Sequence, residues 1–95
     1  MAHSTEYVKA LKKGTMNEDF GLAYDCPVRD NHMDKVLTVA GSTESCILAL
    51  KFGRAKIMIN WAGGWHHAKY DSAGGYCYVN DIVIAIKKLK NKFQR

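Results

Sequence analysis

The segment KIMINWAGGWHH, residues 56–67, places a short apolar run directly before a glycine pair and two neighbouring histidines. The run Lys56–Trp61 is rich in residues that favour strands and is followed by glycine, which predicts a buried strand of a parallel sheet. In a regular strand the side chains of His66 and His67 would point to opposite faces. Because the glycine pair frees the backbone, both rings can instead turn toward one cavity.

Helices are predicted on both sides of this segment. Ser4–Lys13 has capping residues at its start and a glycine after its end, residues 14–34 have the composition of a loop, and Ser42–Phe52 carries apolar residues that suit a second helix. A third helix should follow Asn80 or Asp81 as its N-cap, with lysines opposite an apolar stripe. The stripe consists of Ile82, Ile86, Leu89 and Phe93. The order helix, strand, loop, helix favours an α/β layered architecture.

The composition is that of one small globular domain. The chain has 95 residues, of which 47% are hydrophobic and 24% charged. A net charge of +5 would favour acidic partners, and much of it lies in the C-terminal lysines and Arg95. Lysines opposite an apolar stripe are usually the solvated face of a helix, and the interleaved aromatics of a nucleic-acid surface are absent from this stretch. We therefore expect no direct contact with nucleic acid.

The cysteines and the apolar runs indicate where such a chain would reside. Three cysteines form neither a CxxC pair nor an even disulfide framework, and the start of the chain has no apolar core of a secretory signal. The apolar run Ile82–Ile86 is too short to span a membrane. We expect free thiols, no membrane partner, and residence in the nucleus and/or the cytoplasm.

The histidine pair has three interpretations on residue types alone. Adjacent residues chelate a single metal ion poorly, so proton transfer is the better chemical role, with one imidazole acting and the other tuning charge. Metal ligation and an ordinary loop or core pair remain as alternatives.

Three motifs in order resemble zinc-dependent histone deacetylases. Asn60–Lys69 (NWAGGWHHAK) is similar to the family's histidine-pair segment, Gly74–Ile82 (GGYCYVNDI) to its glycine–aromatic–Cys-Tyr-x-Asn-Asp segment, and Gly21–Pro27 (GLAYDCP) to its Tyr-Asp-Cys-Pro rim loop. The resemblance runs over essentially the whole chain and is greatest to the eighth-type branch of class I. Residues 1–95 are thus identified as a partial histone deacetylase domain. This implies a fragment of the three-layer α/β/α arginase–deacetylase fold with its parallel sheet.

The resemblance also implies an activity, the hydrolysis of acetyl-lysine in histones or other proteins by a zinc-activated water. His67 matches the family's general base, which passes the proton toward the leaving lysine amine. His66 matches the neighbouring imidazole, which supports the developing charge. Zn²⁺ is therefore the expected cofactor, and an acetylated histone or another acetyl-lysine protein is the expected partner.

Four further residues match substrate-binding positions of the family. Asp25 matches the rim carboxylate that accepts hydrogen bonds from the substrate backbone, and Trp65 matches the wall behind the catalytic centre. Gly75 and Tyr76 match the tunnel wall that grips the apolar lysine stem. Because the family commonly has phenylalanine at the position of Tyr76, its hydroxyl either points to solvent or alters substrate preference.

The family's zinc ligands, an Asp-x-His pair that ends the next strand and a later aspartate, have no counterpart in this sequence. Asp30-Asn31-His32 has the spacing of such a pair but falls in a polar loop. We therefore predict no metal ligands in this chain, an incomplete zinc set, and no turnover by the isolated chain. The alternative is a non-catalytic truncated product that at most binds partners.

Cys26 and Cys77 both adjoin motifs of the site, and in the parent fold they could approach each other. They form either a redox-sensitive pair or two ordinary buried thiols. Thiol counting after mild peroxide separates the two, because a reactive pair would lose titratable thiols.

Overall fold

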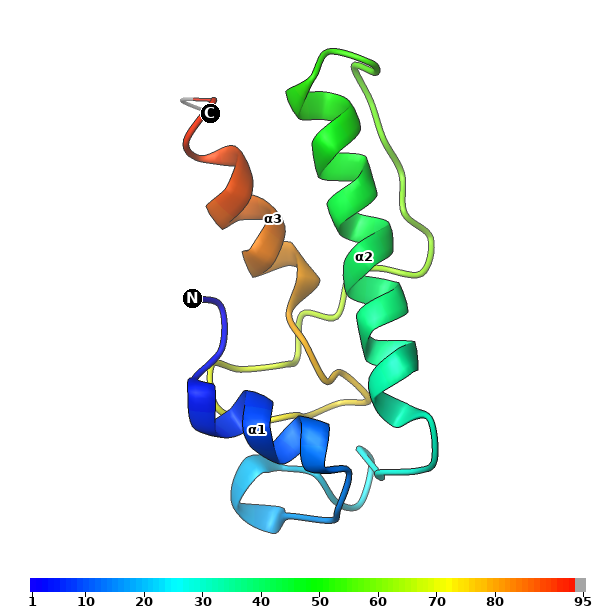
Figure 1. Cartoon of the computed structure of the whole chain (residues 1–95), viewed down its shortest axis with the longest axis vertical. Coiled ribbons are helices and arrows are strands. Elements are labelled where there is room, and N and C mark those ends of the chain that lie inside the picture. The colour runs from blue at the N-terminus through cyan, green and yellow to red at the C-terminus, as the bar shows by residue number, and fades with distance from the viewer. Residues whose placement is uncertain (94–95) are drawn as a thin grey trace.

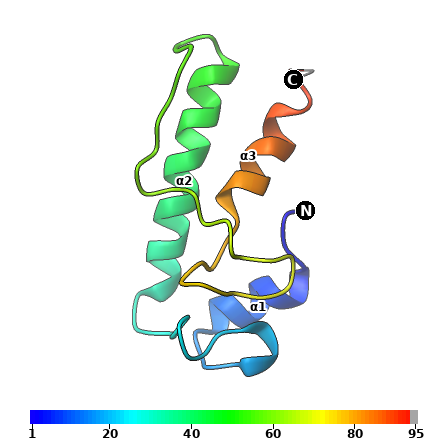
Figure 2. The same cartoon turned by 180° about the vertical axis from the view of Figure 1, so that it is seen from behind.

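The computed structural model describes residues 1–93, and its long axis follows one long helix (Figure 1). The helical elements in chain order are α1 (Thr5–Lys13), the short 3-10 helix η1 (Glu18–Phe20), α2 (His32–Lys51) and α3 (Asp81–Leu89). α3 packs beside α2, whereas α1 lies across one end of the molecule (Figure 1). The connection from α2 to α3 runs back along α2 and then makes a wide loop near α1 (Figure 2). No helix within the described residues is long and apolar enough to cross a bilayer.

α1 forms where the sequence predicts it. The Ser4 hydroxyl oxygen accepts a hydrogen bond from the Tyr7 N–H at 3.1 Å, and Gly14, at φ 71°, ends the helix. Tyr7 and Leu11 lie one turn apart and are both buried. They enter a small core between α1, the first turns of α2 and the loops. This core consists of Tyr7, Leu11, Leu22, Cys26, Val36, Ala73 and Val79.

The second helix is much longer than the sequence predicts. It begins at His32 instead of Ser42, so the end of the predicted 14–34 loop is helical, and η1 occupies another part of that loop. The polar run Arg29-Asp30-Asn31 favours a loop, but the helix begins directly after it. Within the helix the hydroxyls of Thr38 and Ser42 bond to carbonyls four residues back, at 2.7 and 2.8 Å. Burial of Val36 and Ile47 on the same helix outweighs the weak propensities.

α3 confirms the predicted N-cap. The Asn80 side-chain oxygen accepts from the Val83 N–H at 3.0 Å. The apolar stripe of α3 is only partly covered: Ile82 and Ile86 are 40% and 58% exposed. Arg95, at the end of the predicted basic stretch, lies outside the described residues.

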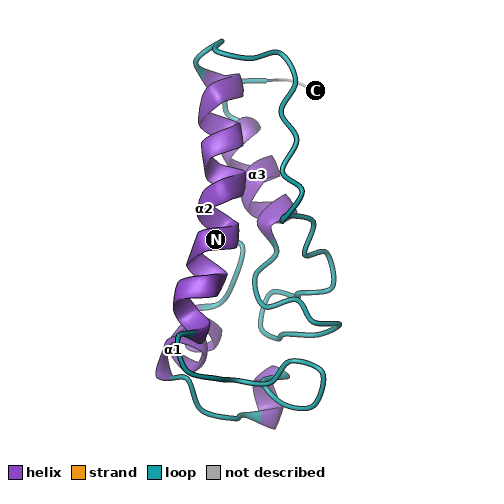
Figure 3. Ribbon diagram, turned by 90° about the vertical axis from the view of Figure 1, so that its right-hand side faces the viewer, coloured by secondary structure: helices purple, strands orange, loops and turns teal. Residues whose placement is uncertain are grey.

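The predicted strand Lys56–Trp61 is not part of a sheet in this chain. Among the described residues the only β pairings are isolated bridges, and Figure 3 shows the segment as loop. Ile57, Ile59 and Trp61 are 81%, 64% and 90% exposed. A parallel strand needs a neighbour to satisfy its backbone, and the rest of the described chain folds as helices and turns. The parallel sheet of the predicted three-layer α/β/α fragment is therefore not confirmed within residues 1–93.

Candidate active site

The two histidines of the pair lie ring against ring. Their centroids are 4.2 Å apart with planes inclined by 38°, and both side chains are exposed. The backbone turns at Gly64, which has φ 92°, and Nδ1 of His66 lies 3.0 Å from the Gly64 carbonyl oxygen. The turn that the glycines permit thus brings both imidazoles together, as a cooperating pair requires.

His67 also lies against the backbone of Gly75. A Cβ atom at Gly75 would lie 2.7 Å from Cγ of the His67 ring, and Gly75 has φ 51°, so only glycine fits without a shift. The Gly75 N–H donates to Oδ2 of Asp25 at 3.0 Å. Three predicted site residues, distant in sequence, therefore meet at one place on the surface.

Tyr76 and Trp65 take up different positions around this place. Tyr76 has φ 63° and is 76% exposed, so its ring stands out into solvent beside Gly75. Trp65 is half-buried and packs on the core, with its ring centroid 5.8 Å from that of Tyr78. Trp65 thus packs toward the inside of the molecule, while Tyr76 adjoins Gly75 on the outside, and the wall role predicted for Trp65 stays a prediction.

Asp81 anchors the loop that carries the histidines. Its buried carboxylate accepts from the N–H groups of Gly64 and Trp65, at 3.0 and 2.8 Å, and from the Thr43 hydroxyl at 2.7 Å. Burial raises the pKa of Asp81, but these hydrogen bonds outweigh it and the pKa is lowered overall. The contact is so close that a Cβ atom at Gly63 would lie 2.5 Å from Oδ2 of Asp81. The loop is therefore tied at once to α2 and to the start of α3.

Asn80 holds the other side of the same loop. Its side-chain amide donates to the Ala68 carbonyl at 3.0 Å and to the His66 carbonyl at 3.5 Å. From the sequence, Asn80 and Asp81 are predicted only as alternative caps of the helix and as part of the matched segment Gly74–Ile82. The burial of Asp81, which the sequence does not indicate, shows that it does more than cap the helix.

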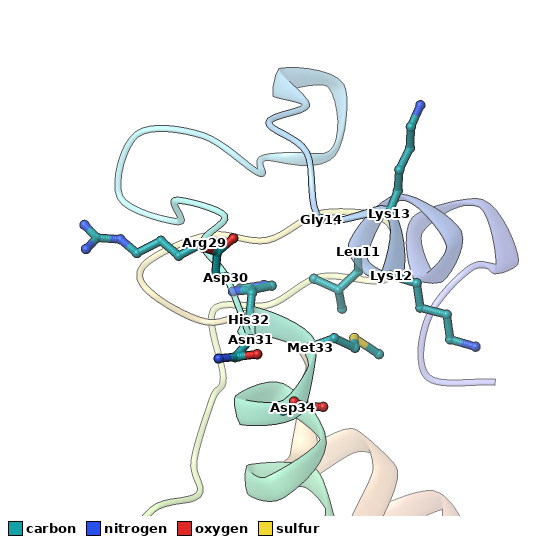
Figure 4. A pocket seen from close by; sticks show the side chains of 10 residues that line it. All are labelled: Leu11, Lys12, Lys13, Gly14, Arg29, Asp30, Asn31, His32, Met33 and Asp34. Carbon is teal, nitrogen blue, oxygen red and sulfur yellow. The ribbon is translucent and has the colours of Figure 1, made fainter.

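No group of three or more possible metal ligands occurs among residues 1–93. The tripeptide Asp30-Asn31-His32, considered for its spacing, spans the start of α2 with Asp30 exposed and the His32 side chain buried. His32 borders a hollow of about 330 Å³ between the ends of α1 and α2. Figure 4 shows Lys12, Lys13 and Arg29 pointing away from this hollow and from one another. Neither histidine of the pair lines this hollow. The expectation that this chain holds no metal ligands stays a prediction.

The thiols next to the site are free. Cys26 and Cys77 are both buried, and Sγ of Cys26 lies 3.8 Å from the Cys77 carbonyl oxygen. Burial raises the pKa of the Cys26 thiol, which disfavours the reactive thiolate. The redox pairing of these two cysteines stays a prediction.

Replacing Gly75 with alanine is expected to displace the His67 ring and to lower the free energy of unfolding by about 1–3 kcal/mol, because the added methyl group overlaps the ring and φ is positive. The matched control is Gly74→Ala. There the nearest atom to the new methyl group, the His67 carbonyl oxygen, lies at an ordinary 3.6 Å. Thermal unfolding followed by circular dichroism compares the two, and equal losses in both variants would show that the close packing of Gly75 on His67 is unimportant.

Comparisons with known proteins show the family of the chain. The sequence pattern of the family described as Histone deacetylase domain matches residues 1–95. Histone deacetylase 8 of Danio rerio is 44% identical over 101 residues, covering 98% of this chain and 27% of the relative. Histone deacetylase 8 of Xenopus tropicalis is 42% identical with the same coverage. Histone deacetylase 19 of Arabidopsis thaliana is 39% identical over 102 residues, covering 20% of its length. The chain thus spans about a quarter of the length of the first two relatives.

Proposed function

The chain belongs to the histone deacetylase domain family, and on that premise we propose that it supplies the histidine pair and part of the rim of a protein lysine deacetylase. The observation that carries the proposal is the meeting of His67, Gly75 and Asp25 at one exposed place. Its substrate would be an acetylated histone or another protein that carries acetyl-lysine, and it would act in the nucleus and/or the cytoplasm.

His67 would serve as the general base. Its exposed ring can receive a proton from a water that attacks the acetyl carbonyl, and can return it to the departing lysine amine. His66, in ring contact, would support the charge that develops during this transfer. The Asp81 and Asn80 contacts fix the backbone that carries the two rings, which lowers the entropy cost of reaching a reactive geometry.

The substrate would lie along the surface that Asp25, Gly75 and Tyr76 form. One oxygen of Asp25 accepts from Gly75, and within the described residues the other has no protein partner, so it can accept a backbone N–H of the substrate. The Tyr76 ring offers an aromatic face to the uncharged acetyl-lysine stem. Its exposure favours the alternative in which the hydroxyl points to solvent.

The resemblance to zinc-dependent deacetylases implies that this protein uses zinc. The ion would then be held by polypeptide outside this chain. The described residues do not fit a catalytic zinc site, which takes three protein ligands. We therefore assign no step of the reaction to the metal on the basis of this chain, and we propose that the isolated chain has no turnover.

The same outside polypeptide would complete the parallel sheet. The segment 56–60 is extended and exposed, and α3 follows it with a partly covered stripe of Ile82 and Ile86. A strand followed by a helix packs back onto a second parallel strand in a right-handed crossover, which would cover both surfaces. This exposed apolar surface also supports the alternative of a non-catalytic product that binds partners.

A replacement chimera tests the proposed function. Substituting this chain for the 101-residue matching segment of the Danio rerio relative should give a folded enzyme that deacetylates an acetyl-lysine peptide and is inhibited by a zinc chelator. The isolated chain with added zinc is the comparison and should show no turnover. A folded chimera that binds zinc without turnover would refute the proposal, and chelator-sensitive turnover by the isolated chain would refute the assignment of the ligands to other polypeptide.

A further inference from the structure

His3 is a buried histidine that touches a distant part of the chain through both ring nitrogens. Its side chain is 5% exposed, and its ring centroid lies 5.3 Å from that of Tyr7 on α1. Nδ1 lies 3.3 Å from the Tyr70 carbonyl oxygen, and Nε2 lies 2.9 Å from the backbone nitrogen of Asn80. The ring therefore bridges the loop after the histidine pair and the start of α3.

These partners define one protonation state of His3. The backbone N–H of Asn80 can only donate, so Nε2 must accept and carry no proton. The Tyr70 carbonyl can only accept, so Nδ1 carries the proton and donates it. Both contacts are satisfied only by the neutral ring with its proton on Nδ1.

Asn80 connects His3 to the segment that carries the histidine pair. Its side-chain oxygen caps α3 through the Val83 N–H, and its side-chain amide donates to the carbonyls of His66 and Ala68, the residues on either side of His67. The position of the Asn80 backbone therefore determines the positions of the peptide groups on either side of His67.

We propose that His3, in its neutral form, is a positioning residue for the histidine pair, which it holds through Asn80. This inference rests on the proposed function, because positioning matters only if the pair acts on a substrate. His3 itself is buried and takes no part in proton transfer at the site.

Acidification is expected to break the hydrogen bond between the Asn80 N–H and Nε2 of His3. A second proton on Nε2 would face the N–H of Asn80, so the hydrogen bond would be lost and the ring would leave its place. Burial lowers the pKa of His3, against the opposing effect of the Lys69 and Tyr70 carbonyls. The neutral ring is favoured above the ordinary histidine pKa of 6.5, and the stabilisation is lost as the pH falls below it. The elements packed around His3 carry further titratable groups: Glu6, Tyr7, Lys9, Lys12 and Lys13 on α1, Lys69, Tyr70 and Asp71 on the loop, and Asp81, Lys87 and Lys88 on α3. The Met1 amine lies on the segment of His3 itself, and the Met1 carbonyl accepts from the Lys87 ammonium.

Two substitutions separate positioning from bulk packing. In His3→Gln the side-chain oxygen can reach the place of Nε2 and accept from Asn80, but it does not titrate. In His3→Phe the ring volume is kept and the acceptor is lost. The readout is nuclear magnetic resonance of the 95-residue chain: the amide signal of Asn80 is followed from pH 7.5 to 5.5, and the amide signals of His66 and Ala68 are compared between variants at pH 7.5.

We expect the unchanged chain to show the Asn80 signal moving with an apparent pKa below 6.5, and His3→Gln to hold it near its pH 7.5 position throughout. His3→Phe should show the signals of Asn80, His66 and Ala68 displaced already at pH 7.5. If His3→Phe unfolds the chain, the His3→Gln titration decides: a flat profile supports the proposal, and displaced signals overturn it. Unchanged signals in His3→Phe, or a disordered spectrum of the unchanged chain at pH 7.5, would also overturn it. Because no substrate is present, the result is independent of whether the chimera has turnover.

Discussion

Replacing Asp81 with alanine is expected to remove most of the free energy of unfolding of the chain at 25 °C. The buried carboxylate accepts from two backbone N–H groups and from the Thr43 hydroxyl, and its removal leaves these donors without a partner. A buried donor that loses its partner costs about 1–3 kcal/mol, so the combined loss should be about 4 kcal/mol. The total stability of a small domain is of the order of 5 kcal/mol, so only about 1 kcal/mol would remain and about a sixth of the molecules would be unfolded without denaturant. Chemical denaturation followed by circular dichroism measures this loss.

The matched control for this variant is Glu44→Gln. Glu44 forms an ion pair with Lys88 in which both side chains are substantially exposed, so its loss should change the unfolding free energy by less than about 1 kcal/mol. Acid gives a second check. Because the hydrogen bonds lower the pKa of Asp81, its contribution is present above the ordinary value of 3.8 and is lost as the pH falls below it. Equal losses for Asp81→Ala and Glu44→Gln would show that the carboxylate does not anchor the loop.

In the chimera, replacing His67 with alanine is expected to lower the turnover number by about 10³-fold. A positioned general base typically contributes about 10²–10⁴-fold, and the methyl side chain of alanine can neither receive nor return a proton. The Michaelis constant should change little, because the lysine stem is bound by other residues, among them Gly75 and Tyr76. Steady-state kinetics on an acetyl-lysine peptide measures both constants.

Asp71→Asn is the control for His67→Ala. Asp71 is exposed at the tip of the loop four residues further along, and no site contact involves its side chain among those described. Its kinetics should match those of the unchanged chimera. A His67→Ala chimera with unchanged turnover would remove the role of general base from this residue.

Local signals predicted the helices better than the sheet. α1 and α3 were predicted because Ser4, Gly14 and Asn80 act within a few residues of their own position. The start of α2 at His32 was missed because burial of Val36 against distant residues outweighs a loop-like composition. The strand at 56–61 could not form for a different physical reason, since sheet pairing requires a neighbour that the described residues do not offer.

The site residues likewise divide into those that the sequence predicted and those that it did not. The glycine turn predicted that the rings of His66 and His67 could face one place, and the family resemblance indicated that Gly75 and Asp25 belong beside them. The residues that hold this geometry were missed. Asp81 and His3 act on partners 16 to 77 residues away, so nothing in their immediate sequence indicates the contact.

The zinc content of the purified His67→Ala chimera tests the central claim most directly. The claim is that the exposed imidazole moves a proton while other polypeptide holds the metal. We predict that this variant retains about one zinc ion per chain, as the unchanged chimera does, although its turnover is lost. A folded variant that loses its zinc together with its activity would contradict the account, because His67 would then be a ligand of the metal and not the base.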